Sequence, residues 1–413
     1  MSKTFTVSCI GAGQRGFIYL SEMMKLKDNK FKIISICDKN EVRLKYFQKV
    51  FNVDPQNCFL DEDEFFKNNT ADLCVVSTQD QAHVNHAIKA MESGSNVLCE
   101  KPISDNKEGV LKLLEAQKKY QKQVMVCHVL RFAPAFVQVK KWLNNHEIGD
   151  IVTIDSIENV HYPHQAHSYV RGNWRRKEDT SPMIIAKCCH DLDLFYWYTE
   201  SKCLSVSSIG DLRFFKKENQ PEGASDRCKD CKYRGKCEYD AYEIYVNRDF
   251  WGREIVTNTR PITDEAVIEA LDKGPYGRCV FACDNDVVDN QIVMMRFANG
   301  ITVNLRMIGL TAYPGRIMKF YGTHGQIDLD EVSGHITLTK FGKEPIIKNI
   351  STLTDATNGH GGGDHGLIEA LYEYLSTGKS ENVSSLDASV ESHLIGFAAE
   401  ESRLNDGRII FLK

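Results

Sequence analysis

The first third of the chain alternates between short apolar runs and longer segments in which apolar residues recur with helical spacing. Strands are predicted for the run from Phe5 up to Gly11 and for Phe31–Cys37, Leu73–Ser77, Asn96–Cys99 and Val124–Cys127. Helices are predicted between them, at Phe17–Leu26, Glu41–Phe51, Asp61–Lys67, Ala82–Ser93 and Asn106–Tyr120. Because such alternation produces a parallel sheet covered on both faces, residues 1–130 are predicted to form a doubly wound Rossmann domain of the α/β class.

The pattern changes after residue 131. Longer strands separated by tight turns are predicted at Ile151–Asn159, Val206–Leu212, Asp289–Phe297, Ile301–Leu310 and Arg316–Tyr321. Helices are predicted at Pro134–Asn145, Pro182–Tyr198 (with Ser181 as N-cap), Leu367–Leu375 and Ser385–Leu404. Residues 131–413 are therefore predicted to form an α+β domain with a large, mostly antiparallel open sheet, interrupted by a Cys-rich insertion at about residues 214–286.

Three glycines follow the first predicted strand. Gly11, Gly13 and Gly16 complete the pattern GxGxxG, and Gln14 and Arg15 stand within it. At a strand-turn-helix junction these glycines allow a tight turn and close approach of the backbone to a pyrophosphate, which the helix N-terminus attracts. The sequence therefore predicts a dinucleotide site in which these five residues contact the cofactor.

An acidic residue follows the second predicted strand. Asp38 lies about twenty residues after the glycines, where a carboxylate would bind the adenosine ribose of NAD and repel the extra phosphate of NADP. NAD is the predicted cofactor. Lys39 beside it could compensate for that charge, so NADP stays open.

Polar residues also follow the other predicted strands. The carboxyl ends of parallel strands line the ligand cleft. We therefore expect contacts with the cofactor from Thr78, His83, Glu100 and Lys101, and contacts with the substrate from His128 and Arg131. Loop capping is the alternative for Thr78 and His83.

Composition narrows the class of protein. The 413 residues are 42% apolar and 26% charged with a net charge of −5, which argues against a nucleic-acid surface. No apolar run approaches membrane-spanning length and no secretion signal is recognisable, so a cytoplasmic protein is expected.

The GAGQRG segment, the Glu100-Lys101-Pro102 triplet and a helix carrying His190 together resemble the glucose-fructose oxidoreductase, inositol dehydrogenase and rhizopine catabolism family. The likeness extends over nearly the whole chain. It implies a Rossmann domain, NAD or NADP as cofactor and a sugar, cyclitol or glycoside as substrate. It also implies a homodimer or homotetramer formed through the C-terminal sheet.

Hydride transfer from an alcohol also requires removal of the hydroxyl proton and stabilisation of the developing alkoxide. Lys101 and His190 are the predicted catalytic residues. Relatives often carry an aspartate four residues before this histidine, where this chain has Ala186. Lys187 is the predicted substitute, because residues three apart share one face of a helix. The alternatives are a surface lysine for Lys101 and helix residues without a catalytic function for the other two.

Two polar segments are candidates for substrate binding. The segment from His161 to Trp174 combines polar groups with aromatic surface, as sugar sites do, and contributes the candidates His164, His167, Arg171 and Trp174. The glycine-rich segment around residue 362 contributes His360 and Asp364. Asp364 as a plain N-cap is the alternative.

The insertion contains the strongest metal signal. Cys228 and Cys231 have CxxC spacing, and Cys237 follows six residues later. Zinc needs four ligands, and Cys279 or Cys283 could supply the fourth. The alternative is a set of plain thiols, since this chain also uses cysteine freely in its predicted strands.

Three functions are compatible with these residues. The first is an NAD(P)-dependent dehydrogenase of a sugar, glycoside or cyclitol. The second, which some relatives resemble, is a redox-assisted glycosidase that keeps NAD bound through a cycle of oxidation, elimination, hydration and reduction. The third is a dinucleotide-binding sensor without chemistry, against which the presence of Lys101 and His190 argues.

Overall fold

The computed structural model describes residues 3–248, 250–353, 359–380 and 382–412. An N-terminal parallel sheet has the order β3-β2-β1-β4-β5-β6. Its strands are β1 (Phe5–Ile10), β2 (Phe31–Cys37), β3 (Cys58–Phe59), β4 (Leu73–Val76), β5 (Asn96–Cys99) and β6 (Val124–Val126). The connecting helices are α1 (Gln14–Lys25), α2 (Glu41–Phe51), α3 (Glu62–Asn68), α4 (His83–Glu92) and α5 (Lys107–Tyr120). The predicted Rossmann domain is confirmed.

A second sheet has the order β14-β13-β12-β11-β7-β10-β9-β8-β15. Its strands are β7 (Ile151–Asn159), β8 (Cys203–Asp211), β9 (Asn290–Phe297), β10 (Thr302–Ile308), β11 (Gly315–Gly322), β12 (Gly325–Asp330), β13 (His335–Lys340), β14 (Ile346–Asn349) and β15 (Ile410–Phe411). All neighbours are antiparallel except β7 and β10, which run parallel. The mostly antiparallel sheet is confirmed, and the last four of these strands were not predicted.

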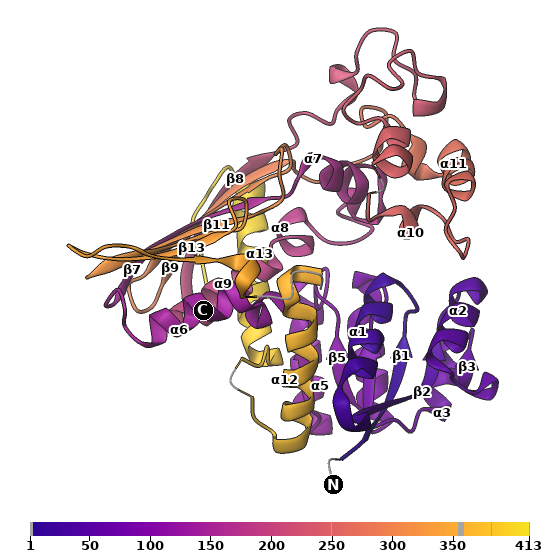
Figure 1. Ribbon diagram of the computed structural model, residues 1–413, viewed down its shortest axis with the longest axis horizontal. Helices are drawn as coiled ribbons and strands as arrows, with labels where there is room; N and C mark the ends of the chain where they lie inside the picture. The colour runs from indigo at the N-terminus through magenta and orange to yellow at the C-terminus, as the bar shows by residue number, and fades with distance from the viewer. Residues whose placement is uncertain (1–2, 249, 354–358, 381, 413) are drawn as a thin grey trace.

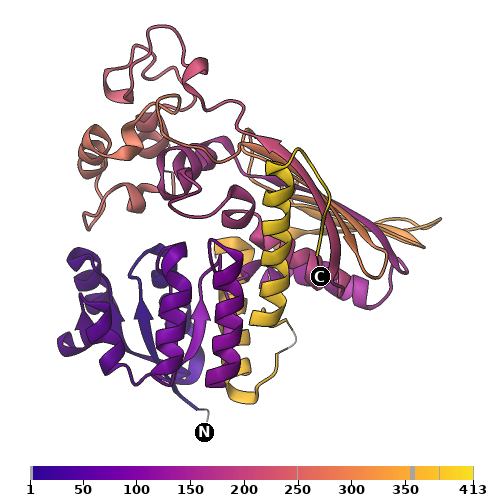
Figure 2. The same ribbon diagram turned by 180° about the vertical axis from the view of Figure 1, so that it is seen from behind.

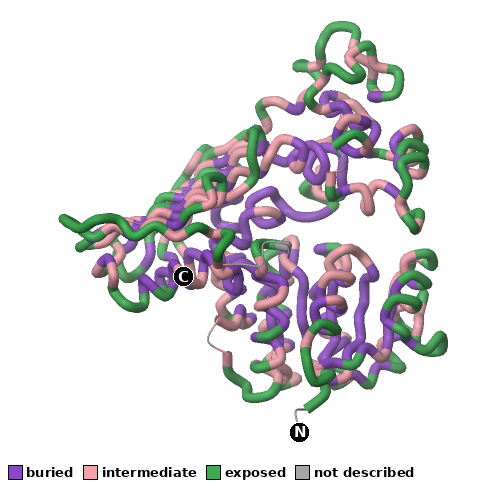
Figure 3. The backbone as a smooth tube through the Cα atoms, in the orientation of Figure 1, coloured by how far each residue is buried: buried purple, intermediate pink, exposed green. Residues whose placement is uncertain are grey.

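Helices cover one face of this sheet: α6 (Pro134–Asn144), α8 (Met183–Ala186), α9 (Cys189–Thr199) and α13 (Leu386–Leu404). A continuous apolar core fills the space between the sheet and these helices. On the opposite face, apolar side chains such as Ile209 and Met294 are exposed. Figure 3 shows buried backbone concentrated along the central strands and the helices next to them, and exposed backbone at the sheet tips.

The C-terminal segment returns to the Rossmann domain. Helix α12 (Gly363–Thr377) packs against α1, and α13 contacts α5 as well as α9 and β8. Between these two helices, the Ser384 carbonyl accepts a hydrogen bond from the Val126 amide (3.0 Å). Both domains are thus joined by the last part of the chain, which is yellow in Figure 2.

The insertion has a small core of its own. It contains α10 (Arg253–Val256) and α11 (Asp264–Lys273), and its buried residues include Tyr245 and Leu271. In Figure 1 it lies beyond the carboxyl ends of the Rossmann strands. Arg43 of α2, in the Rossmann domain, donates a hydrogen bond to the side chain of Asn258 in the insertion (3.2 Å). The insertion therefore faces the edge where a dinucleotide binds.

Two local predictions were wrong. The predicted helix Pro182–Tyr198 is broken into α8 and α9, and Ser181 donates to Asp80 (2.9 Å) instead of capping a helix. The segment after His161 is helical, with α7 (Tyr162–His164) followed by a π-helical segment, Gln165–Arg171. Both differences change which side chains share a face.

Candidate active site

The glycine loop after β1 has the form that a pyrophosphate requires. Gly11 has φ +98°, and a Cβ there would lie 2.5 Å from the Ser77 carbonyl oxygen; a Cβ on Gly16 would lie equally close to the Gly11 oxygen. A Cβ on Gly13 would meet nothing within 4 Å. Gly13 precedes α1, whose first turn begins with Gln14 and has no side-chain cap. The open space and the free N–H groups fit a bound phosphate.

Asp38 is held beside this loop. Its carboxylate accepts hydrogen bonds from the backbone N–H groups of Ala12 (2.6 Å) and Asn40 (2.7 Å). These bonds fix the acid at the end of β2, where the ribose of a dinucleotide would lie. The residues therefore fit an NAD molecule.

Arg15 and Glu100, predicted as cofactor contacts, pair with each other. Arg15 donates to Glu100 (2.8 Å) and to Asp364 of α12 (2.5 Å). Glu100 also accepts bonds from the Tyr19 hydroxyl (2.5 Å) and the Lys101 backbone N–H (2.6 Å). Burial raises the pKa of Glu100, but Arg15 and Lys101 outweigh this effect and the net shift is downward. The ionised carboxylate thus orients the segment that carries Lys101.

Thr78 and His83 brace the loops that follow β4 and β5. The two ring nitrogens of His83 lie 2.7 Å from the Pro102 carbonyl oxygen and 3.0 Å from that of Thr78. The Thr78 hydroxyl contacts the ring of His86 (3.0 Å). Contacts of this kind are those that the loop-capping alternative expects, and the predicted contact with the cofactor stays a prediction.

Lys101 and His190 approach each other across the domain boundary. The Lys101 ammonium donates to the Ala186 carbonyl (2.9 Å), at the end of α8. His190, in the first turn of α9, is 6% exposed, and its ring lies 5.7 Å from that of His128 and 6.1 Å from that of His360. Burial lowers the pKa of His190 well below its ordinary value, and the charge of Lys101 adds to this effect. His190 is therefore neutral at pH 7.

Buried imidazole nitrogens in this cluster have no hydrogen-bond partner within the described part of the chain. This holds for Nδ1 of His190 and for both nitrogens of His128, which is fully buried. Buried polar atoms without a hydrogen-bond partner are rare, and a catalytic or ligand-binding function is one explanation for them. Substrate or water would satisfy them here.

Lys187 does not share a helical face with His190, because it lies in the break between α8 and α9. Its ammonium pairs with Glu158 of β7 (2.9 Å). Glu158 also pairs with Arg316 of β11 (2.8 Å), which in turn binds Asp191 (2.8 Å). Lys187 therefore belongs to a buried four-residue ion network.

Sequence reasoning missed Glu158, although a signal was present. Along β7 the buried positions Ile154 and Ser156 alternate with more exposed ones, and Glu158 continues the buried series. A carboxylate at a core-facing strand position needs a buried partner. The alternation of core-facing positions along β7 could therefore have identified Glu158 from the sequence.

Arg131, a predicted substrate residue, is occupied by another buried ion pair. It donates to both oxygens of Asp193 (2.6 and 2.7 Å), and both residues are buried. Its geometry is that of a structural bidentate pair. His128 follows β6 next to it and stays in the cluster around His190.

The structure separates the four candidates of the segment 161–174. His164 lies near Lys187 and Lys101: burial lowers its pKa well below the ordinary value, and these two charges lower it further. Trp174 donates to Asp80 (3.2 Å) at the domain boundary. His164 therefore lies near Lys101 and Lys187, and Trp174 contacts Asp80 at the domain boundary.

His167 and Arg171 lie within the core of the insertion instead. The His167 ring stacks on Tyr276 (4.9 Å between centroids) and contacts the Tyr245 hydroxyl (2.7 Å). Arg171 donates to the carbonyl groups of Arg278 (2.7 Å) and Tyr239 (2.6 Å). Both side chains support the insertion.

His360 and Asp364 contact each other at the start of α12. His360 Nδ1 lies 3.0 Å from the Asp364 carboxylate. Asp364 is not the N-cap, since that position is Gly362. Burial opposes its ionisation, but His360 and Arg15 lower its pKa to about 2. Asp364 thus orients the His360 ring beside His190.

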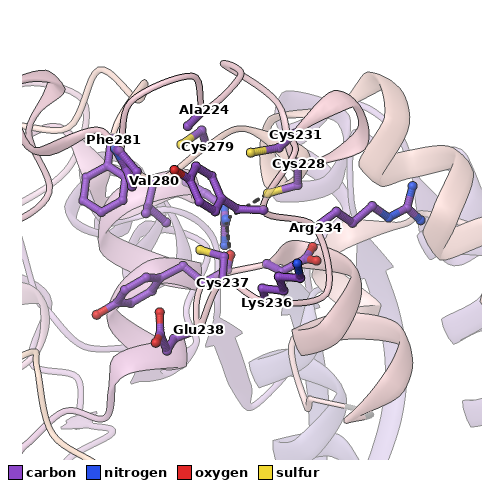
Figure 4. Close-up of a pocket in the computed structure, with 15 residues that line it drawn as sticks. Ala224, Cys228, Cys231, Arg234, Lys236, Cys237, Glu238, Cys279, Val280 and Phe281 are labelled. Carbon is purple, nitrogen blue, oxygen red and sulfur yellow. Dashed lines mark hydrogen bonds between the residues drawn. The ribbon is translucent and has the colours of Figure 1, made fainter.

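The cysteines of the insertion surround a cavity of about 150 Å³. Its lining includes Cys228, Cys231, Cys237 and Cys279, but not Cys283, and Figure 4 shows the four thiols around it. All fourteen cysteines carry free thiols. Over the described residues, no three His, Cys, Asp or Glu side chains are already arranged as a metal site.

Fold and site together define a two-domain oxidoreductase with a dinucleotide-binding Rossmann domain. Family models agree: residues 5–128 match the oxidoreductase family with an NAD-binding Rossmann fold, and residues 140–409 match its C-terminal alpha/beta domain. The chain belongs to the glucose-fructose oxidoreductase, inositol dehydrogenase and rhizopine catabolism family, as the motifs predicted.

Individual relatives are distant. The chain is 23% identical to the YteT protein of Bacillus subtilis over 88% of this chain and 87% of that protein. It is 25% identical to an inositol 2-dehydrogenase of an Arthrobacter species over 67% of this chain and 77% of that enzyme.

Solved structures share the fold. The WlbA dehydrogenase of Bordetella pertussis, in complex with NADH and UDP-GlcNAcA, superposes with a TM-score of 0.72 at 15% identity, covering 100% of this chain and 99% of that one. An inositol dehydrogenase homologue of Azotobacter vinelandii, complexed with NAD+, gives a TM-score of 0.71 at 15% identity, covering 100% and 98%. No described helix is both long and apolar enough to span a bilayer.

Proposed function

We propose that the protein is an NAD-dependent dehydrogenase that transfers a hydride between nicotinamide and a hydroxyl-bearing carbon of a sugar, glycoside or cyclitol. One observation carries the proposal: Lys101 and the neutral His190 lie near each other at the carboxyl ends of the Rossmann strands. Among the described residues, Nδ1 of His190 has no hydrogen-bond partner. Acid/base groups at that place are what alcohol oxidation needs.

Each of the two residues has a distinct part in the proposed reaction. The neutral His190 imidazole has an unpaired Nδ1 that can accept the hydroxyl proton. The Lys101 ammonium, anchored by the Ala186 carbonyl, can hold the substrate oxygen as negative charge develops on it. Bound NAD would supply the hydride acceptor. His164, whose pKa burial also lowers, would bind a neighbouring hydroxyl.

The substrate class is supported by similarity as well as by chemistry. Inositol 2-dehydrogenases are among the relatives, and one neighbour holds a nucleotide sugar acid. Several neutral imidazoles around one lysine suit a polyhydroxylated substrate, because each can donate or accept one hydrogen bond.

We propose NAD in preference to NADP. The Asp38 carboxylate is fixed by two backbone N–H groups beside the glycine loop, so it cannot easily turn away from a 2′-phosphate. Its negative charge would repel that group.

The face of the large sheet that no helix covers supports a homodimer or homotetramer. Ile209 and Met294 are more than half exposed there (58% and 57%). A second subunit that packs on this face would remove these apolar side chains from water. Light scattering coupled to size-exclusion chromatography tests this proposal, and a monomer at micromolar concentration would contradict it.

A redox-assisted glycosidase is the second candidate. It needs an additional base to remove the proton next to the oxidised carbon, and the unpaired ring nitrogens of His128 favour it. A panel of sugars, cyclitols and aryl glycosides incubated with NAD distinguishes the two functions. Stoichiometric NADH indicates a dehydrogenase, and released aglycone without net NADH indicates the glycosidase. If NAD binds but no substrate gives either signal, the result would favour a sensor.

A further inference from the structure

The cavity in the insertion, called here the thiol cavity, combines four cysteines from two separate segments. Cys228, Cys231 and Cys237 come from the loop before residue 240, and Cys279 comes from the segment after α11. The backbone N–H of Cys279 donates to the Asp226 carbonyl (2.9 Å), which fixes the two segments side by side. The four sulfur atoms are drawn around one space in Figure 4.

The same cavity is lined by a buried charge that lacks an acidic partner. Arg171 has no exposed surface, and its hydrogen bonds go to the two carbonyl groups described above and to the Cys228 sulfur (3.6 Å). Among the described residues Nη1 has no partner, and no carboxylate pairs with this guanidinium. Burying a cation without a counter-charge is costly. Something negative should therefore occupy the space beside it.

We propose that the thiol cavity is a structural zinc site with four thiolate ligands and that Arg171 offsets its charge. The ligands are Cys228, Cys231, Cys237 and Cys279. Zn²⁺ displaces one proton from each thiol, so that four sulfur–zinc bonds form, four protons are released and the site carries a net charge of −2. A guanidinium that contacts one of the sulfurs neutralises half of that charge.

The structure also selects the fourth ligand. Cys279 lines the cavity, whereas Cys283 does not and directs its thiol to the Cys279 carbonyl (3.3 Å). The thiols lie on the cavity walls and are not yet arranged as a ligand set. Zinc binding therefore requires the four side chains to turn inward and contract the cavity.

Such a site would tie together the two halves of the insertion. It would fix the loop before residue 240 to the segment that carries Tyr276, on which His167 stacks. Trp251, another residue of the insertion, contacts His164 at the active site (5.1 Å between ring centroids). The metal would thus fix the part of the insertion that lies next to the active site, without contacting substrate.

The test uses the full-length reduced protein. Elemental analysis after purification without added metal should give about one zinc per chain, and cobalt substitution should give the absorption of a tetrahedral cobalt thiolate. Cys279→Ser should lose most of the zinc and the cobalt–thiolate signal, whereas the matched control Cys283→Ser should keep both. Arg171→Met should weaken zinc about 10- to 100-fold in competition with a chelator, the scale expected for a group supporting metal ligands.

These readouts do not depend on turnover or on NAD, so they remain informative if the proposed function fails. Folding of each variant is checked by circular dichroism, and the cobalt titration of the parent protein does not require any variant to fold. A reduced parent protein that binds neither zinc nor cobalt would overturn the proposal. Equal loss of metal in Cys279→Ser and Cys283→Ser would overturn the ligand set.

Discussion

Two groups of buried or half-buried ionisable residues meet at the boundary between the domains, and they differ in how completely they are paired. In the first group every charge has a partner: Arg15 with Glu100 and Asp364, Arg131 with Asp193, and Lys187 with Glu158. In the second group, Lys101 bonds to a carbonyl. Among the described residues, Nδ1 of His190 and both ring nitrogens of His128 have no hydrogen-bond partner, and Nε2 of His128 lies 3.9 Å from the Asp193 carboxylate.

The difference separates support from chemistry. Buried ions remain charged only when partners repay the loss of water, so the paired group fixes the positions of strand ends and helices. The imidazoles without hydrogen-bond partners stay neutral, and their ring nitrogens can form hydrogen bonds with substrate. Substitutions in the first group should affect stability, and substitutions in the second should affect rate.

The largest effect is expected from breaking a paired ion. Arg131→Leu leaves the buried Asp193 carboxylate without its bidentate partner and should cost about 3–5 kcal/mol of stability, measured by urea or thermal unfolding. Arg408→Leu, at an exposed position, is the matched control. If Arg131→Leu keeps its stability but raises KM, Arg131 binds substrate as the sequence suggested.

Removing the unpaired cation should affect catalysis alone. Lys101→Met should lower kcat by about 100-fold or more, because the ammonium acts on charge that develops in the transition state. Calorimetry should show NAD affinity close to that of the parent. Lys107→Met, an exposed lysine at the start of α5, should leave both parameters unchanged. A Lys101→Met enzyme that turns over at the parent rate would make the residue structural.

The pH dependence sharpens the contrast further. His190 acts in its neutral form. Burial and the charge of Lys101 lower its pKa, so the pH must fall well below the ordinary pKa of about 6.5 before the imidazole is protonated. The acid limb of kcat/KM should therefore lie below that pH. Because Lys101→Met removes this positive charge, the acid limb of that variant should move to higher pH. A limb at the ordinary histidine value that Lys101→Met does not move would exclude His190 as the base.

The smallest effect concerns cofactor choice. Asp38→Ala should reduce the preference for NAD over NADP by about tenfold, or about 1.4 kcal/mol, because the charge facing the 2′-phosphate is lost. The two affinities are compared by calorimetry. Asp38→Asn keeps a similar size and hydrogen-bond acceptor and isolates the charge. A ratio that neither change alters would exclude Asp38 as the determinant.

Much of the architecture could be predicted because its signals are local. The glycine motif, the apolar runs of the Rossmann strands and the position of Asp38 all depend on near neighbours in sequence. The long sheet was only partly predicted: in β12 and β13 polar residues alternate with the apolar ones, and β14 buries none of its residues, so none of the three forms an apolar run.

Pairings across the chain could not be predicted in this way. The sequence contains no signal for the bond between Arg15 and Asp364, or for Lys187 leaving the helix to meet Glu158. Apolar residues stand on both sides of the break, at Met183–Ala186 before it and at Cys189 and Leu192 after it, so the pattern continues across it and does not reveal it. His167 and Arg171 were grouped with His164 because they are close in sequence, but the π-helical segment directs them to the core of the insertion.

The most direct test of the central claim is a double-mutant cycle on the unpaired group. It compares kcat of the parent with that of Lys101→Met, His190→Asn and the double variant on a substrate that the panel identifies. If both residues serve one proton path, each single change should cost about 100-fold, and the double variant should be scarcely slower than either one. Losses that multiply in the double variant, or a His190→Asn enzyme with the parent rate, would contradict a shared site.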